Sequence, residues 1–169
     1  MASKLGMTAT ERKAVMRNQA SELLWYGKIE TTLARAKNLR SYVEKIITLA
    51  INTYGDVIET TETTKDKKGK ETTQKVYKDG VKKLSARRKI MGKVYDIQER
   101  RNEGEGMSEF KKRTEGIQHP LISKIFDEIA PKYAQRAEEL KQKGGYTRIY
   151  RLGERRGDCA EKAIIELVD

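Results

Sequence analysis

The residues of this chain with the most evident chemistry are its arginines and lysines. Near the C-terminus the glycines and the Tyr, Ile and Thr content predict a strand over 144–153, a basic loop, and a second strand over about 163–168. A guanidinium group matches phosphate oxygens with a planar fork of donors and also stacks on nucleic-acid bases. Tyr146, Arg148 and Tyr150 alternate along the first strand, so we expect them to share one face. That face either meets RNA or packs on helices, and the alternation alone leaves both open.

The chain offers little for covalent or metal chemistry. His119 is the only histidine and Cys159 the only cysteine. A nucleophile and a base need a group that orients the base, and no motif near either residue supplies one. One histidine and one cysteine also fall short of the usual tetrahedral zinc set. We therefore predict that the chain is not an enzyme and has no cofactor, no metal site and no small-molecule substrate.

The composition favours a nucleic-acid partner. The 169 residues hold 36 Lys and Arg against 25 Asp and Glu, a formal net charge of +11. A soluble protein that is merely basic is the alternative. One cysteine excludes an intrachain disulfide, and no apolar run approaches the ~18 residues that suggest a membrane span. With no hydrophobic signal region at the N-terminus either, we expect a cytoplasmic protein that does not contact membranes.

Helical periodicity predicts two helices in the first third of the chain. Thr8 and Glu11 have capping-box spacing, so a helix should begin there, run to about Tyr26 and end at Gly27. Residues 28–32 should form a strand. A second helix should run from about Leu33 to Asn52, capped by Thr31 or Thr32, and these residues form its apolar stripe: Ala36, Leu39, Val43, Ile47 and Ala50. The cations in its first turns conflict with the helix dipole unless an anion binds there.

The middle of the chain predicts an insert, a basic helix and a linker. Thr-rich arms flank a lysine-rich tip, which predicts a long hairpin over about 53–80, with a disordered polar insert as the alternative. Residues 81–98 return to helical spacing and are strongly basic. Their expected apolar stripe is Val81, Leu84, Met91 and Tyr95, with Ile90, Val94 and Ile97 beside it. The stretch 99–119 should be a linker with one helical turn near 108–113.

The last predicted helix begins at Pro120, which suits a first helical position. Ile122, Ile125, Phe126 and Ile129 form its apolar stripe. Pro131 should kink or restart the helix, which continues to Gly144-Gly145. We expect a single domain over 1–169 with a basic arm at 1–7.

Charge and placement select the candidate RNA-contacting cations. They lie in the arm, on the first three helices, at the start of the first strand, and in the closing hairpin and its loop. The set is Lys4, Arg12, Lys13, Arg17, Lys28, Arg35, Lys37, Arg40, Arg87, Arg88, Arg148, Arg151, Arg155 and Arg156. Because the loop arginines should not be needed for the core, replacing Arg155 and Arg156 should weaken RNA binding with little change in melting temperature.

Several of these motifs occur in one order that resembles a known family. They are Lys4-Leu5-Gly6, Ile29-Glu30-Thr31-Thr32-Leu33, Phe126-Asp127-Glu128-Ile129-Ala130-Pro131, Gly144-Gly145-Tyr146-Thr147-Arg148, Arg155-Arg156-Gly157-Asp158 and Ile165-Glu166-Leu167-Val168. The chain is similar to the bacterial large-subunit ribosomal protein seventeen family over roughly residues 4–52, 84–98 and 121–168. Residues 53–83 and 99–119 exceed that family's shortest forms.

The resemblance implies a two-layer α+β fold of order α–β–α–α–α–β–β with a three-stranded sheet, to which the inserted hairpin is added. It also implies a structural role without catalysis or a cofactor. The expected partners are large-subunit rRNA, near the outer end of the peptide exit tunnel, and neighbouring ribosomal proteins. A free-standing RNA- or DNA-binding regulator is the alternative. For the hairpin tip, the hypothesis is contact with rRNA or a neighbouring protein through Lys65, Lys67, Lys68 and Lys70.

Overall fold

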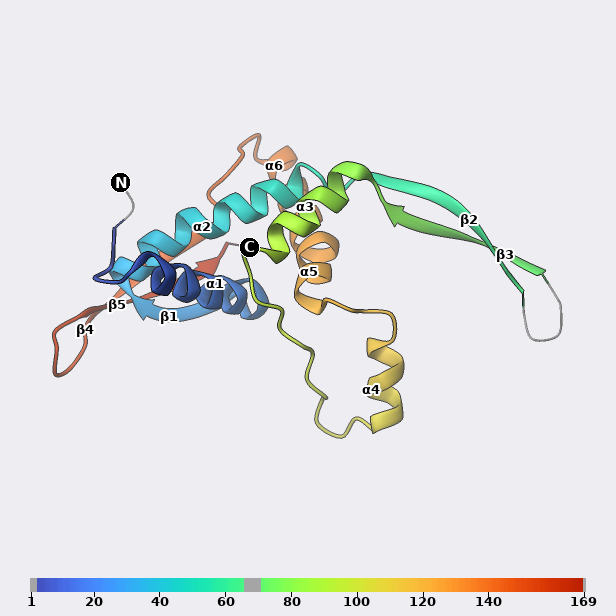
Figure 1. Ribbon diagram of the computed structural model, residues 1–169. Helices are drawn as coiled ribbons and strands as arrows, with labels where there is room; N and C mark the ends of the chain where they lie inside the picture. The colour runs from blue at the N-terminus through green and yellow to red at the C-terminus, as the bar shows by residue number, and fades with distance from the viewer. Residues whose placement is uncertain (1–2, 66–70, 169) are drawn as a thin grey trace.

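The computed structural model describes residues 3–65 and 71–168, and it is a two-layer α+β fold with a projecting hairpin (Figure 1). The elements in chain order are α1 (Ala9–Tyr26), β1 (Lys28–Thr32), α2 (Leu33–Ile51), β2 (Val57–Lys65), β3 (Glu71–Asp79), α3 (Val81–Met91), α4 (Met107–Thr114), α5 (Pro120–Lys124), the π-helical turn η1 (Ile125–Ile129), α6 (Ala130–Glu139), β4 (Thr147–Glu154) and β5 (Glu161–Leu167). This order confirms the fold class, and the predicted linker contains α4.

The main sheet has the strand order β1-β5-β4 and is antiparallel throughout. Ile29, Ile165 and Ile149 stand opposite one another across the three strands, and this row packs toward the core formed with α1 and α2. Because side chains alternate along a strand, Arg148 and Tyr150 point to the other face and are exposed. The sheet therefore turns Arg148 away from the helices.

Tyr146 does not share that face, so this part of the prediction is wrong. It precedes β4, is only 5% exposed, and packs its ring on Tyr133 of α6 with centroids 5.0 Å apart. The Tyr133 hydroxyl donates to the Tyr146 carbonyl at 3.3 Å. Tyr146 is a core residue that joins α6 to the sheet.

The first two helices have their predicted bounds to within about one residue, but the predicted side-chain cap of α2 is wrong, because Thr32 at its N-cap position makes no capping hydrogen bond. The Glu11 amide donates to the Thr8 hydroxyl and the Thr8 amide donates to the Glu11 carboxylate at 2.9 Å, the reciprocal capping box that starts α1. Gly27 ends the helix with φ 80°, a left-handed conformation that glycine adopts without strain. The stripe predicted for α2 is fully buried at all of its positions. It forms the centre of the core.

The helix α3 differs from its prediction in length and in orientation. It ends at Met91 rather than near Gln98, and Val81 and Leu84 of the predicted stripe are exposed, as are Met91 and Tyr95. Ile90 and Val94, which were predicted beside the stripe, are buried, and Lys83 also faces inward. Asp79 explains the rotation, since it accepts from Lys83 at 3.1 Å and from Arg87 at 2.6 Å.

The inserted hairpin is confirmed. β2 and β3 pair antiparallel from Val57–Asp79 at the base to Lys65–Glu71, and the ribbon extends away from the body (Figure 1). Asp56, just before β2, accepts from the amides of Lys82 and Lys83 and so caps α3 from outside that helix. The side chain of Lys65 and the tip residues 66–70, with their three predicted lysine contacts, lie outside the described part of the chain.

The predicted effect of Pro131 is visible as the π-helical turn η1. Proline has no amide hydrogen and its ring crowds the carbonyl four residues earlier, and a wider turn relieves that conflict. Pro120 takes the first position of α5 as predicted. The helix α6 ends at Glu139, five residues before the predicted end at Gly144. Lys141 has a left-handed φ of 51°, and Leu140 is exposed and does not anchor a further turn to the core.

Candidate RNA interface

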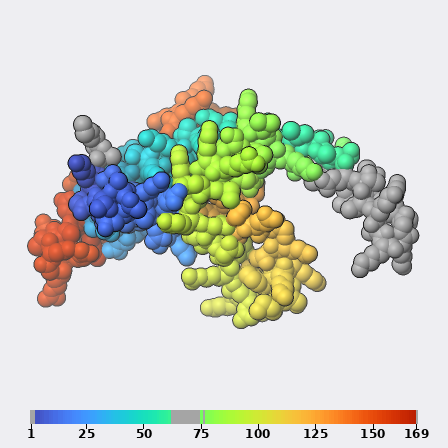
Figure 2. Space-filling view, in the orientation of Figure 1, coloured from blue at the N-terminus to red at the C-terminus, as the bar shows by residue number. Residues whose placement is uncertain are grey.

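Many of the predicted cations gather at one end of the molecule. There the N-terminal arm, the starts of α1 and α2, and the β4–β5 hairpin lie together, which Figure 2 shows as blue beside red on the left. We call this the basic end and define it by Lys4, Arg12, Lys13, Arg35, Lys37, Arg155 and Arg156. Lys4, Lys13, Lys37, Arg155 and Arg156 are exposed, and Arg12 and Arg35 are half-buried.

The first turn of α2 opens into a hollow of about 670 Å³ at this end. Three segments line it: Ser3 of the arm, then Thr32, Leu33, Ala34, Lys37 and Asn38 at the start of α2, and Ala160 with Glu161 at the start of β5. Thr32 makes no side-chain cap, and the first turn carries no acidic residue. The backbone amides at this terminus and the partial positive charge of the helix dipole are therefore available to an anion.

Asn38 also lines this hollow. Its side-chain nitrogen is buried and has no hydrogen-bond partner among the residues described. Sequence reasoning missed this residue because Asn carries no charge. The sequence feature that could have identified Asn38 is its position next to Lys37, in the second turn of a helix whose first turn is basic.

The β4–β5 loop holds two adjacent arginines in different states. Arg155 forms a bidentate ion pair with Asp158, in which Nε donates a hydrogen bond of 3.0 Å to Oδ1. These hydrogen bonds from Arg155, joined by one from the Ala160 amide, lower the pKa of Asp158 to about 2. Arg156 is exposed and makes no ion pair within the described residues. The pair with Asp158 shapes the loop, and Arg156 remains directed at solvent.

The outer face of the sheet carries both signs of charge. Lys28 of β1 and Arg148 of β4 stand on either side of Glu166 of β5. A hydrogen bond from Arg148 to the Tyr150 hydroxyl, at 3.4 Å, and the nearby Glu166 raise the pKa of the guanidinium. Lys162 pairs with Glu30 at 2.8 Å on the same face. Lys28 and Arg148 are thus exposed but partly neutralised, and Arg151 is exposed farther along β4.

Three further predicted cations also have structural partners. Arg17 donates to the Gly92 carbonyl and lies over the Tyr95 ring, Arg87 binds Asp79, and Arg40 pairs with Glu44 at 3.4 Å. Arg88, next to Arg87, is exposed on the outer side of α3. The structure thus separates cations that hold the fold together from cations that point into solvent.

The candidates for other chemistry remain apart. His119 lies 2.9 Å from Asp96 at the start of α5, while Cys159 is exposed in the β4–β5 loop at the opposite side of the molecule (Figure 1). Within residues 3–65 and 71–168, no group of three or more His, Cys, Asp or Glu side chains has a metal-binding arrangement. Across the same residues, every helix is too short or too polar to span a membrane.

Comparison with known proteins gives a consistent family. The family model described as "Ribosomal protein L17" matches residues 15–168. The protein named "Large ribosomal subunit protein bL17" from Lachnospira eligens is 39% identical, covering 98% of this chain and 97% of the relative. Proteins of the same name from Acetivibrio thermocellus and Halothermothrix orenii are 35% and 37% identical, with 98% of this chain covered and 97% and 96% of the relatives.

Proposed function

This chain belongs to the ribosomal protein L17 family, and we propose that it is a structural protein of the large ribosomal subunit that binds large-subunit rRNA near the outer end of the peptide exit tunnel. The observation that carries the proposal is the coverage of the match. Relatives named as large-subunit proteins align over nearly their whole length and over 98% of this chain. Such a protein works in the cytoplasm, on the ribosome, and needs neither a catalytic residue nor a cofactor.

The basic end supports the assignment of rRNA as the partner. It combines exposed cations with a helix terminus that lacks a side-chain cap, two features that phosphate groups satisfy together. Lysines and arginines that displace counterions from RNA supply sequence-independent affinity, and this affinity falls steeply with salt. We assign the first contacts to Lys37 and Arg156, which are exposed and make no ion pair in the described structure.

Sedimentation distinguishes this function from that of a free-standing RNA- or DNA-binding regulator. A tagged copy of the whole chain, expressed in a bacterium, should sediment with large subunits and remain there after a high-salt wash. Recovery of the chain only in the soluble fraction would contradict the ribosomal assignment.

A charge-matched pair of variants tests the basic end. Replacing Lys37 and Arg156 with alanine should weaken binding to isolated large-subunit rRNA and reduce the slope of log affinity against log salt by about 1 for each phosphate that is no longer bound. The control removes two exposed lysines of α4, Lys111 and Lys112, and should leave that slope unchanged. Equal effects in the two variants would show that only total charge matters.

The location near the tunnel has its own test. Cys159 is the only cysteine and is exposed at the basic end, so an iron chelate that generates hydroxyl radicals can be attached there. In reconstituted large subunits we expect cleavage of the rRNA segments that surround the tunnel exit. Cleavage confined to other regions would refute this location while leaving ribosomal membership intact.

A further inference from the structure

We propose that the segment around α4, residues 99–119, is a docking arm for a neighbouring protein of the large ribosomal subunit and does not bind rRNA. This inference rests on the proposed function, because it concerns a partner within the same particle. The arm leaves the body after α3 and returns to it at α5, and in Figure 2 it forms a separate lobe below the body.

The arm is electrically neutral in a strongly basic chain. Residues 99–119 hold five Lys and Arg and five Asp and Glu, so they contribute 5 − 5 = 0 to the net charge of +11. A polyanion gains little by binding a neutral segment, since few counterions are released. The charge of the arm therefore argues against rRNA and in favour of a partner of low net charge.

Apolar packing does not account for the shape of the arm. No residue of α4 is buried, and an isolated helix of eight residues is marginal in water. A hollow of about 420 Å³, lined by Asn102, Arg113 and Lys124 among others, separates the arm from α5. The body therefore contributes little apolar burial to the arm.

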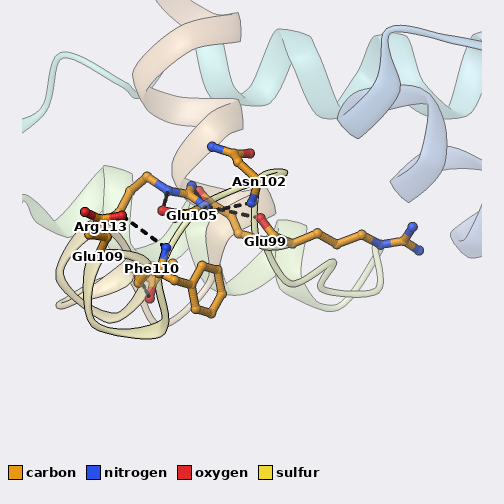
Figure 3. Close-up of polar contacts among 9 residues, drawn as sticks. Glu99, Asn102, Glu105, Glu109, Phe110 and Arg113 are labelled. Carbon is orange, nitrogen blue, oxygen red and sulfur yellow. Dashed lines mark hydrogen bonds and ion pairs between the residues drawn. The ribbon is translucent and has the colours of Figure 1, made fainter.

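Arg113 supplies the rigidity instead (Figure 3). It donates to Glu105 through Nε at 2.9 Å, pairs with Glu99, and donates to the Arg100 carbonyl at 3.1 Å. The hydrogen bond from Arg113 lowers the pKa of Glu105, and the same bond raises that of Arg113. Because the guanidinium is used within the arm, it is not presented to phosphates.

Two further hydrogen bonds fix the start of α4. The Asn102 amide donates to Glu105 at 2.9 Å, and the Gly106 amide donates to Glu109 at 3.1 Å (Figure 3). Such an arrangement is pre-organised, so a partner that binds it loses little ordering entropy. This is the expected property of a recognition element.

The arm presents apolar side chains for such a partner. Met107 is 59% exposed and Ile117 is 38% exposed. Phe110 lies one turn after Met107 on the same helix face, where Arg113 stacks on its ring at 5.5 Å. Phe110 is half-buried, and an exposed methionine next to an aromatic ring and an arginine is typical of the centre of a protein interface. The partner surface that fits them is an apolar patch with charges of both signs at its rim.

Photo-cross-linking in assembled particles tests the proposal. Benzoylphenylalanine replaces Met107 in one variant and Arg156 in another, and large subunits that contain each variant are purified and irradiated. We expect the Met107 position to cross-link a ribosomal protein and the Arg156 position to cross-link rRNA. If the Met107 position cross-links rRNA alone, or nothing, in particles that contain the chain, the proposal is overturned. Absence of the chain from large subunits would instead contradict the proposed function.

A matched pair of substitutions gives a second readout. Met107→Glu and Ser108→Glu each add one negative charge to the first turn of α4, and both sites are exposed, so neither should prevent folding. Met107→Glu should lower the yield of protein cross-links from a probe at Ile117 by at least about tenfold, the effect of removing an interface residue worth more than about 1.4 kcal/mol. Ser108→Glu should retain the yield. Equal yields in the two variants would overturn the proposal.

Discussion

Asp79 links the inserted hairpin to the body, and its replacement by asparagine should destabilise the fold measurably. Its carboxylate accepts from Lys83 at 3.1 Å and from Arg87 at 2.6 Å, and the side chains of Asp79, Lys83 and Arg87 are only 23%, 11% and 24% exposed. Breaking a fully buried ion pair by removing one partner costs about 3–5 kcal/mol. The Lys83 ammonium keeps its position 5.8 Å from the Phe126 ring, and Arg87 can turn toward water. We therefore expect Asp79→Asn to lower the free energy of unfolding by about 2 kcal/mol.

Thermal unfolding followed by circular dichroism measures this decrease. For a chain of this length, about 2 kcal/mol corresponds to a fall of roughly 4–8 °C in the melting temperature. The control is Glu30→Gln, which breaks the exposed ion pair with Lys162 and should cost at most about 0.5 kcal/mol. Adding Lys83→Met to Asp79→Asn removes the Lys83 ammonium, which has lost its carboxylate partner, and should restore part of the free energy of unfolding.

The pH dependence supplies the decisive comparison. Partial burial of Asp79 favours its neutral form, but the hydrogen bonds from Arg87 and Lys83 outweigh burial, so folding lowers the pKa of this carboxyl. A lowered pKa contributes stability that is present above the unfolded value and lost as pH falls through the folded one. The difference in the free energy of unfolding between the native chain and Asp79→Asn should thus become smaller below about pH 4. The reasoning would be refuted if Asp79→Asn lowered the free energy of unfolding no more than Glu30→Gln does, or if its effect did not change with pH.

Two other predictions concern single contacts. A Cβ added at Gly80 would lie 2.4 Å from the Asp56 carboxyl that caps α3, so Gly80→Ala should cost about 1 kcal/mol in denaturant unfolding, whereas Gly55→Ala, with open space around the added atom, should cost less than about 0.5. Removal of the Arg155 guanidinium by Arg155→Ala should raise the pKa of Asp158 from about 2 toward its ordinary value of about 3.9, measured by NMR titration, while Arg156→Ala should leave it low.

The sequence predicted the fold well where local signals and burial agree. The capping box at Thr8 and the stripe of α2 each depend on residues within a few turns of one helix, and the structure confirms both. The orientation of α3 depends instead on polar contacts with Asp79, the last residue of β3, and with Asp56, which precedes β2. Apolar periodicity selected Val81 and Leu84 as core, and these polar contacts turned Lys83 inward in their place. Periodicity alone contains no information about such contacts.

The candidate interface was harder to predict than the fold because charge does not distinguish neighbours of the same type. Arg87 and Arg88 are adjacent, yet Asp79 binds only the first. Arg155 and Arg156 are adjacent as well, and Asp158 again binds the first. In each pair the bound arginine fixes the backbone that carries its neighbour, so the neighbour is presented to solvent from a rigid support. Cations that are pre-organised in this way lose less entropy when they meet a phosphate than cations on a mobile chain. On this reasoning Arg88 and Arg156 should contribute more to rRNA affinity than Arg87 and Arg155, although each pair adds the same charge to the sequence.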